Sequence, residues 1–267
     1  MNDITAEAPP LASRWDANAS FWVTIIRDNR DKYRDQLTNP AMLQAIGDPA
    51  GLKVLDAGCG EGYFSRILAD KGATVTGIDS SGSLIEAAQV RNRADRLAVS
   101  FDVGSVEELL YGDAAFDLVL CNHVLNDLHD PQIAIGEFGR VLRRGGRFVN
   151  LMLHPCFYNK HVERDQATNG LLASSYFDVR SIEQTFEVDG LTSPAANVAW
   201  FRPLEFYTEA LRNSGFVITG LTEPHPSPDQ VAADDWWRKG FSRPLFMLIT
   251  AERRKPDIDH SSAPKVP

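Results

Sequence analysis

A glycine-rich bend directly after a short apolar segment constrains this chain more than any other feature. Residues 54–62 read V-L-D-A-G-C-G-E-G, and a helical pattern follows from Tyr63. Gly58 and Gly60 let the backbone turn sharply and let a ligand approach it closely, because neither carries a side chain. Free amides at the start of the following helix face such a ligand. The segment therefore predicts a strand–turn–helix unit with a ligand site at the turn.

Strand and helix patterns alternate around this unit. Short apolar runs typical of buried strands lie at residues 53–57, 73–78, 97–103, 116–121 and 147–153. Helical patterns lie between them at residues 63–71, 83–92, 106–110 and 131–142. Repeated strand–helix units favour an α/β fold in which helices cover both faces of a mostly parallel sheet. A helix at 203–213 and strands at 216–221 and 245–251 complete the pattern.

The remaining segments divide the chain into parts. Aromatic and apolar residues recur at helical spacing from Trp15 to Ile46, whereas residues 154–200 are aromatic, polar and irregular. The run P-H-P-S-P-D from Pro224 predicts a stiff loop. We expect a disordered tail (1–12), an N-terminal helical cover (13–50), a cofactor-binding core (51–153), an inserted lid (154–202), the C-terminal part of the sheet (203–251) and a second disordered tail (252–267).

Composition argues against several classes of partner. The net charge of −9 disfavours a nucleic-acid backbone or an anionic membrane surface. No run is long and apolar enough for a membrane helix, and the N-terminus does not resemble a secretory signal. Three cysteines cannot form a disulfide framework, and an odd number suits a reducing compartment. We expect a cytoplasmic protein, a monomer or a homodimer, with a small-molecule substrate.

Two carboxylates indicate the type of ligand. A dinucleotide-binding turn reads G-x-G-x-x-G, but Gly62 comes one residue early, and the carboxylate of Asp56 would repel a pyrophosphate. The same carboxylate suits a ligand with a cationic amino group. Asp79 ends the second strand about twenty residues after the turn, where an acid can accept both ribose hydroxyls. Its alternative role is to cap the next helix, which Ser80 or Ser81 can do instead.

Taken together, these segments resemble a known family. Residues 54–153 are similar to the core of class I S-adenosylmethionine-dependent methyltransferases, in particular the ubiquinone- and menaquinone-biosynthesis enzymes and bacterial natural-product methyltransferases of secondary metabolism. The matching motifs are L-D-A-G-C-G-E-G, G-I-D-S, the F-D-L-V-L strand from Phe116 and V-L-R-R-G-G at residues 141–146, read as helical. The resemblance implies a Rossmann-like seven-stranded sheet whose last strand runs antiparallel, with a lid inserted after the fifth strand.

The resemblance also implies roles for particular residues. The methionine moiety of S-adenosyl-L-methionine would lie at Asp56, Ala57, Gly58 and Gly60, and near Asn122. The ribose would lie at Asp79 and Ser80. The adenine would lie at Ser105 and Val106, although family members often carry Asp at the position of Ser105. Tyr33 is a further candidate for cofactor contact.

Two histidines are candidates for a general base. His123 and His154 follow the fourth and fifth strands, and the carboxyl ends of those strands are where open α/β sheets bind ligands. Either imidazole could take a proton from the methyl acceptor, or could simply order its loop. Asp127, His129 and Asp130 would allow a metal site with His123, but their spacing matches no common zinc pattern, and D-P at 130–131 is a helix start. We therefore expect no metal.

The resulting hypothesis is methyl transfer from S-adenosyl-L-methionine to a small, hydrophobic or aromatic metabolite, on oxygen, nitrogen or carbon. Two other classes stay open. One is a non-catalytic S-adenosylmethionine-binding scaffold or regulator, because a fold does not determine function. The other is an NAD-dependent oxidoreductase, which the glycine spacing and Asp56 disfavour. An RNA or protein methylase is a further alternative, and the acidic charge opposes the RNA form.

Overall fold

A computed structural model describes residues 10–95, 97–158, 163–164, 171–172 and 176–254. Most of the two predicted tails therefore lies outside the described residues. Within them, both tail boundaries need correction. Helix α1 already begins at Leu11, and the last strand continues to Arg253, because both segments pack against the rest of the chain.

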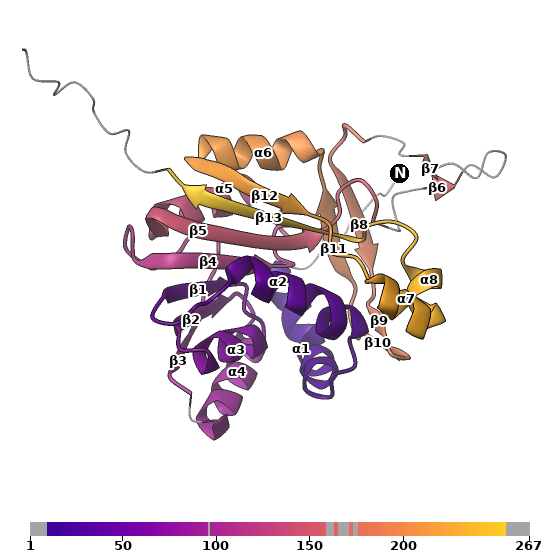
Figure 1. The fold of residues 1–267 in the computed structure, drawn as a ribbon. Coiled ribbons are helices and arrows are strands. Elements are labelled where there is room, and N and C mark those ends of the chain that lie inside the picture. The colour runs from indigo at the N-terminus through magenta and orange to yellow at the C-terminus, as the bar shows by residue number, and fades with distance from the viewer. Residues whose placement is uncertain (1–9, 96, 159–162, 165–170, 173–175, 255–267) are drawn as a thin grey trace, which may run out of the picture.

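The core of the protein is one seven-stranded sheet (Figure 1). Its strand order is β12-β13-β5-β4-β1-β2-β3. The strands are β1 (Lys53–Ala57), β2 (Thr74–Asp79), β3 (Val99–Val103), β4 (Phe116–Asn122), β5 (Leu142–Leu153), β12 (Phe216–Thr222) and β13 (Phe246–Arg253). β1 pairs in parallel with β2 and β4, whereas β13 pairs antiparallel with both β5 and β12. The predicted seven-stranded sheet with an antiparallel last strand is confirmed.

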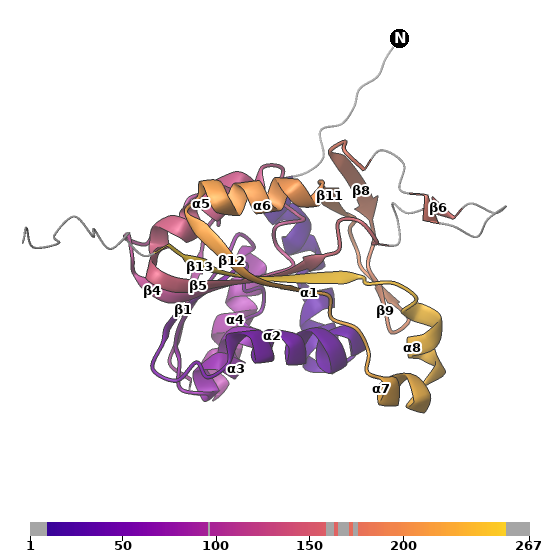
Figure 2. The same ribbon diagram turned by 45° about the horizontal axis from the view of Figure 1, so that its top comes forward.

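Helices cover both faces of the sheet, as predicted (Figure 2). α5 (Pro131–Val141) and α6 (Leu204–Asn213) pack on one face, and α2 (Asn39–Ile46), α3 (Tyr63–Asp70) and α4 (Gly82–Asp95) pack on the other. Successive side chains of β1 alternate between the two faces, so that Leu55 joins one apolar cluster and Val54 the other. α5 starts as the sequence predicts, with Asp130 accepting a hydrogen bond from the Gln132 amide and Pro131 in the first turn.

The helical cover and the insertion meet at the carboxyl ends of the parallel strands. The cover consists of α1 (Leu11–Arg27), a π-helical turn η1 (Arg34–Thr38) and α2. The insertion contains β6 (Glu163–Arg164), β7 (Leu171–Leu172), β8 (Arg180–Gln184), β9 (Glu187–Val188), β10 (Leu191–Thr192) and β11 (Asn197–Phe201). Asn18 of α1 joins them, since its side chain donates to the Ala195 carbonyl (3.0 Å) and accepts from the Ala195 amide (2.9 Å).

Two predicted helices are wrong. Residues 106–110 form a turn followed by irregular backbone. The Glu108 amide donates to the Ser105 carbonyl, but the Leu109 amide donates to Glu137 Oε2 (2.8 Å) of α5 and so makes no helical hydrogen bond. Residues 142–146 belong to β5, and only Val141 lies in a helix. Gly145 has a φ of 72°, a left-handed conformation that a helix does not accommodate.

The stiff loop predicted from Pro224 contains two short helices instead. These are α7 (Pro228–Ala233) and α8 (Asp235–Gly240). The sequence carries the signal for α7, since Ser227 and Gln230 form a capping box and Pro228 occupies the first turn. None of the described helices is both long and apolar enough to cross a membrane.

Candidate cofactor and acceptor site

A cavity of about 540 Å³ opens at the carboxyl ends of the parallel strands. Its wall comes from α1 and η1, from the turns after β1, β2, β3 and β4, and from the insertion around Phe186. This volume lies within the range of small-molecule sites, about 300–1,000 Å³. The location is the one that open α/β sheets use for ligands.

The glycine-rich turn forms one wall of this cavity. Gly58 and Gly60 have φ values of 75° and 56°, a region that residues with a Cβ rarely adopt. The Gly60 amide donates to Asp79 Oδ2 (2.8 Å), and the Gly58 amide donates to the Ile78 carbonyl (2.8 Å). A Cβ on Gly60 would meet no atom within 4 Å, so the turn leaves open space beside its backbone.

Asp79 lies at the cavity, and another residue caps the helix that follows it. Ser81 Oγ accepts from the Leu84 amide (3.2 Å) at the start of α4. Asp79 Oδ1 accepts only the Ser81 amide (2.9 Å) within this turn. Each carboxylate oxygen keeps a further lone pair for a ligand hydroxyl. Burial raises the pKa of Asp79, against the effect of its two backbone hydrogen bonds.

Asp56 is buried behind the turn. It is 1% exposed, and its Oδ2 accepts a hydrogen bond from the Ser65 hydroxyl (2.5 Å). Burial raises its pKa to about 7. Within the described part of the chain, Asp56 has no ion-pair partner. A cationic ligand group in the cavity would favour the ionised form.

Two buried polar atoms in the described residues lack partners at one end of the cavity. Asn122 Nδ2 donates to the Tyr63 hydroxyl (3.2 Å), but Asn122 Oδ1 accepts nothing. The Arg34 guanidinium lies 4.8 Å from the centre of the Tyr63 ring, and its Nη2 donates to the Ile26 carbonyl (3.1 Å) while Nη1 has no acceptor. Arg34 also pairs with Asp35 (3.0 Å), so its unpartnered group is the Nη1 nitrogen alone. This end therefore presents an acceptor oxygen and a guanidinium nitrogen without partners, which suit the ammonium and the carboxylate of an amino acid.

Arg34 is the residue that sequence reasoning missed. It directly follows Tyr33, which the sequence analysis singled out, and both line the cavity. Arg34 begins the π-helical turn η1, and such turns often occur at functional sites. The only signal in the sequence was a cationic residue next to Tyr33. The structure adds that Arg34 is only 8% exposed, and arginine is almost never buried without partners.

The other predicted cofactor residues lie as follows. Tyr33, Ser80, Ser105 and Val106 line the cavity, whereas Ala57 does not, because its side chain is buried in the sheet. The Ser105 hydroxyl already accepts the Glu107 amide (3.1 Å). Tyr33 sits among the rings of Trp236, Trp237, Phe241 and Phe246, which connect it to the segment before β13.

Of the two candidate histidines, only His123 lines the cavity. His123 lines the cavity with a φ of 60°, its amide donates to the Leu151 carbonyl (2.8 Å), and burial lowers its pKa to about 4. His154 does not line the cavity, contrary to the expectation of substrate contact. Its Nε2 lies 2.9 Å from Glu223 Oε1, and its Nδ1 accepts from the Cys156 amide (3.1 Å). These contacts hold the His154 ring at the start of the insertion.

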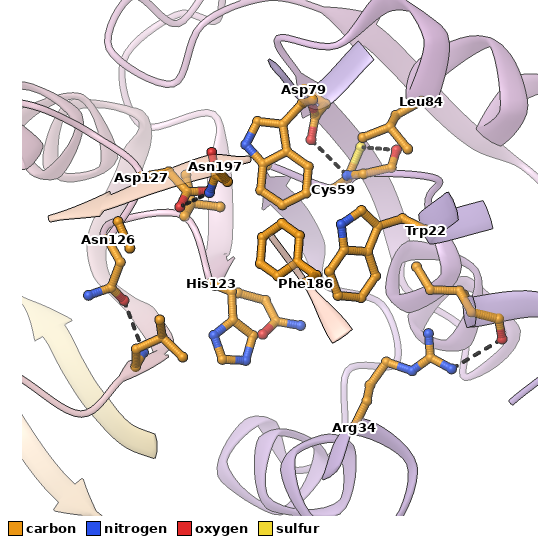
Figure 3. A pocket seen from close by; sticks show the side chains of 18 of the residues that line it. Trp22, Arg34, Cys59, Asp79, Leu84, His123, Asn126, Asp127, Phe186 and Asn197 are labelled. Carbon is orange, nitrogen blue, oxygen red and sulfur yellow. Dashed lines mark hydrogen bonds between the residues drawn. The ribbon is translucent and has the colours of Figure 1, made fainter. Parts of the chain in front are cut away.

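The part of the cavity wall that α1 and the insertion form is aromatic. The Trp15 ring stacks on Phe186 with ring centres 5.8 Å apart, and Trp22 meets the edge of Phe186 at 5.0 Å. Figure 3 shows Phe186 and Trp22 side by side, with Asp79 on one side and His123 on the other. Two of these rings come from α1 and one from the insertion, so the wall exists only when the two segments meet.

No described group of three or more His, Cys, Asp or Glu side chains is placed to hold a metal. Of the residues considered for such a site, Asp130 caps α5, and the exposed His129 contacts the edge of the Trp200 ring at 4.8 Å.

Comparison with known proteins assigns the fold to a family. A family model described as "Methyltransferase domain" matches residues 55–150. The chain is 30% identical over 177 residues to the ubiquinone biosynthesis O-methyltransferase of Xanthomonas oryzae pv. oryzae, covering 64% of this chain and 70% of that protein. The chain belongs to the class I S-adenosylmethionine-dependent methyltransferases. S-adenosyl-L-methionine is accordingly its cofactor.

Two further matches describe the extent of this similarity. The methyltransferase is 36% identical over 114 residues to the ubiquinone biosynthesis O-methyltransferase of Coxiella burnetii, but that match spans only about half of the relative, 49%, and 42% of this chain. A crystal structure of an S-adenosylmethionine-dependent methyltransferase from Mesorhizobium loti superposes with a TM-score of 0.66 at 24% identity, covering 80% of this chain and 96% of that one. The likeness extends well beyond the core that the sequence motifs identify.

Proposed function

We propose that this protein transfers the methyl group of S-adenosyl-L-methionine to a hydroxyl group of a small, largely aromatic molecule. The supporting observation is one continuous cavity with a cofactor-shaped end and an aromatic end. Methylation on oxygen is favoured because the relatives with the matching core are named O-methyltransferases. A cavity of about 540 Å³ suits a metabolite better than a nucleic acid.

The residues at the cofactor end fit the cofactor's groups. Arg34 Nη1 would bind the α-carboxylate, and Asn122 Oδ1 with Asp56 would receive the α-ammonium. Arg34 Nη1 and Asn122 Oδ1 are buried there without partners in the described residues. Asp79 would hold the ribose, with Ser80 beside it, and the turn at Ser105–Val106 would contact the adenine. The open backbone at Gly60 leaves room for the chain between them. When bound, the cofactor supplies an electrophilic methyl group on a positively charged sulfur.

The protein's part in the reaction is to align the acceptor and to exclude water. Trp22 and Phe186 would hold an aromatic ring over the site. A hydroxyl acceptor must lose its proton, and His123 is the cavity-lining imidazole that can receive it. Its lowered pKa leaves the ring unprotonated at physiological pH but also makes it a weaker base, so its position in the cavity carries the assignment. Its positive φ is a conformation that is often found at functional sites. We propose His123, and not His154, for this role.

Calorimetry with S-adenosylhomocysteine tests the cofactor assignment. The wild type should bind it, and Asp79→Ala should weaken binding at least about 10-fold through loss of a charge-assisted pair of hydrogen bonds. Asp229→Asn, an exposed substitution on α7, serves as the matched control and should bind normally. Absence of binding to the wild type would refute the proposal.

Turnover separates an enzyme from a cofactor-binding scaffold. Methyl transfer to a panel of catechols and phenols should be detectable, and His123→Asn should lower kcat while leaving the affinity for S-adenosylhomocysteine unchanged. Tight binding of S-adenosylhomocysteine without turnover on any member of the panel would favour a non-catalytic role.

A further inference from the structure

The part of the cavity beyond the cofactor end is lined by hydrogen-bond acceptors. The proposed cofactor residues follow β1, β2 and β3 or, like Asn122, end β4. The turn after β4, with Asp127, and strand β11, with Asn197, also line the cavity. In Figure 3, Asp127 and Asn197 lie on the side of the cavity opposite Arg34.

Asp127 is a fixed carboxylate without an ion pair. Its Oδ1 accepts a hydrogen bond from Asn197 Nδ2 (2.9 Å), and the Trp15 indole donates a second hydrogen bond. Arg14 of α1 attracts it electrostatically, and Asp79 of β2 repels it, yet no cation forms a salt bridge with it within the described residues. Burial raises the pKa of Asp127 to about 7, a cost that a bound cation would offset.

Asn197 supplies a second, independent acceptor. It is 3% exposed, and its Oδ1 has no hydrogen-bond partner in the described residues. Its orientation is determined by its neighbour, because turning the amide over would place its oxygen against the Asp127 carboxylate. The free oxygen therefore remains beside the carboxylate, and a ligand with several N–H donors satisfies both groups.

The charges on the rest of the wall are consistent with this reading. Glu187 lies exposed at the rim of the cavity, and Asp31 lines it near η1. Arg34 is the only lysine or arginine among the described lining residues, and it faces the cofactor end. Trp22 Nε1 is a buried donor without a partner, but it is neutral. The rings of Trp15, Trp22 and Phe186 add faces that attract cations.

We propose that Asp127 and Asn197 form a subsite for a basic nitrogen, so that the methyl acceptor is an aromatic molecule carrying a protonated amine. This inference rests on the proposed function and specifies its substrate class. The nitrogen need not be the atom that receives the methyl group. A carboxylate at the same position would face a carboxylate and an amide oxygen and would be rejected.

A matched series of catechols tests the subsite. Dopamine carries an ammonium group, 4-ethylcatechol is neutral, and 3,4-dihydroxyphenylpropionate carries a carboxylate. Binding of each to the protein saturated with S-adenosylhomocysteine is measured by calorimetry. We expect dopamine to bind about 10- to 100-fold more tightly than 4-ethylcatechol, and the carboxylate to bind most weakly.

Asp127→Asn supplies the second measurement. It should abolish the preference for dopamine over 4-ethylcatechol while leaving the affinity for S-adenosylhomocysteine within about twofold, and Asp229→Asn should retain the preference. Because the readout is a ratio within one variant, partial unfolding does not affect it.

Each contrary outcome has a clear meaning. Equal binding of the three catechols, binding of none of them, or an unchanged preference in Asp127→Asn would overturn the inference. A large loss of S-adenosylhomocysteine affinity in that variant would assign Asp127 to the cofactor instead and would also overturn it. Failure of the wild type to bind S-adenosylhomocysteine would refute the proposed function itself.

Discussion

At the scale of single residues, the site is described best by the buried polar atoms that lack partners. Arg34 Nη1, Asn122 Oδ1, Asn197 Oδ1 and Trp22 Nε1 all line the cavity, and each lacks a partner in the described residues. A buried polar group without a hydrogen bond costs about 1–3 kcal/mol. A set of four around one cavity is therefore better explained by ligand binding than by packing.

Arg34 provides a residue-scale prediction. Arg34→Gln should weaken S-adenosylhomocysteine binding about 10- to 100-fold, because the α-carboxylate loses its only cationic partner in the described wall. Calorimetry measures the change, and Arg91→Gln, at an exposed residue of α4 outside the cavity lining, is the control. Equal affinities for wild type and Arg34→Gln would remove Arg34 from the cofactor site.

At the scale of elements, the cavity depends on the contact between α1 and the insertion. Asn18 makes two hydrogen bonds to Ala195, and Trp15 and Trp22 pack on Phe186. Arg30, just after α1, pairs with Asp189 (2.7 Å). On the core side, the Arg27 guanidinium pairs with the buried Glu61 (3.1 Å), which also pairs with Arg66 of α3. α1 is thus bound to both the lid and the core.

Asn18 tests whether this contact closes the site. Asn18→Ala leaves the Ala195 amide and carbonyl without their partner, which should destabilise the lid by about 1–3 kcal/mol. We expect faster hydrogen exchange at Ala195 and a faster release of S-adenosylhomocysteine. Asn213→Ala at the exposed end of α6 is the control. Unchanged exchange and release in Asn18→Ala would mean that other contacts hold the lid.

Sequence patterns predict elements well where one period dominates. The strands at β1, β4 and β12 agree with the predicted ranges to within a residue. Prediction fails where other constraints compete, as at Leu109, whose amide donates to Glu137 of α5 and leaves the expected helix unformed, and at Gly145, whose positive φ lies within β5. At α7 the capping box was present in the sequence but was outweighed by the surrounding prolines.

At the scale of the whole molecule, the desolvated carboxyl groups of Asp56 and Asp127 make stability depend on pH. The folded protein raises the pKa of Asp56 and of Asp127 to about 7, from an ordinary value of 3.8. Between those two values the folded state holds the proton and the unfolded state releases it. The contribution of each group is therefore most favourable below about pH 4 and is lost as the pH rises to about 7.

Asp56→Asn should reveal this linkage in the ligand-free protein. The variant removes the buried charge but keeps an oxygen for the Ser65 hydroxyl. Its stability relative to wild type should be greater at pH 8 than at pH 5, by at most about 3 kcal/mol. Thermal unfolding at the two pH values measures the difference, and a difference of the opposite sign would contradict the assignment.

The sequence by itself determined the α/β sheet, the family and the cofactor turn, because these depend on local periodicity and on glycines and acids close together in the chain. Only the tertiary structure decided which distant side chains share the cavity. It brought Arg34, Asp127 and Asn197 to its wall and kept His154 away, with its ring bonded to Glu223. The physical reason is that partners such as Asn18 and Ala195 lie 177 residues apart, and no local pattern encodes a contact that the packing of the cover against the lid creates.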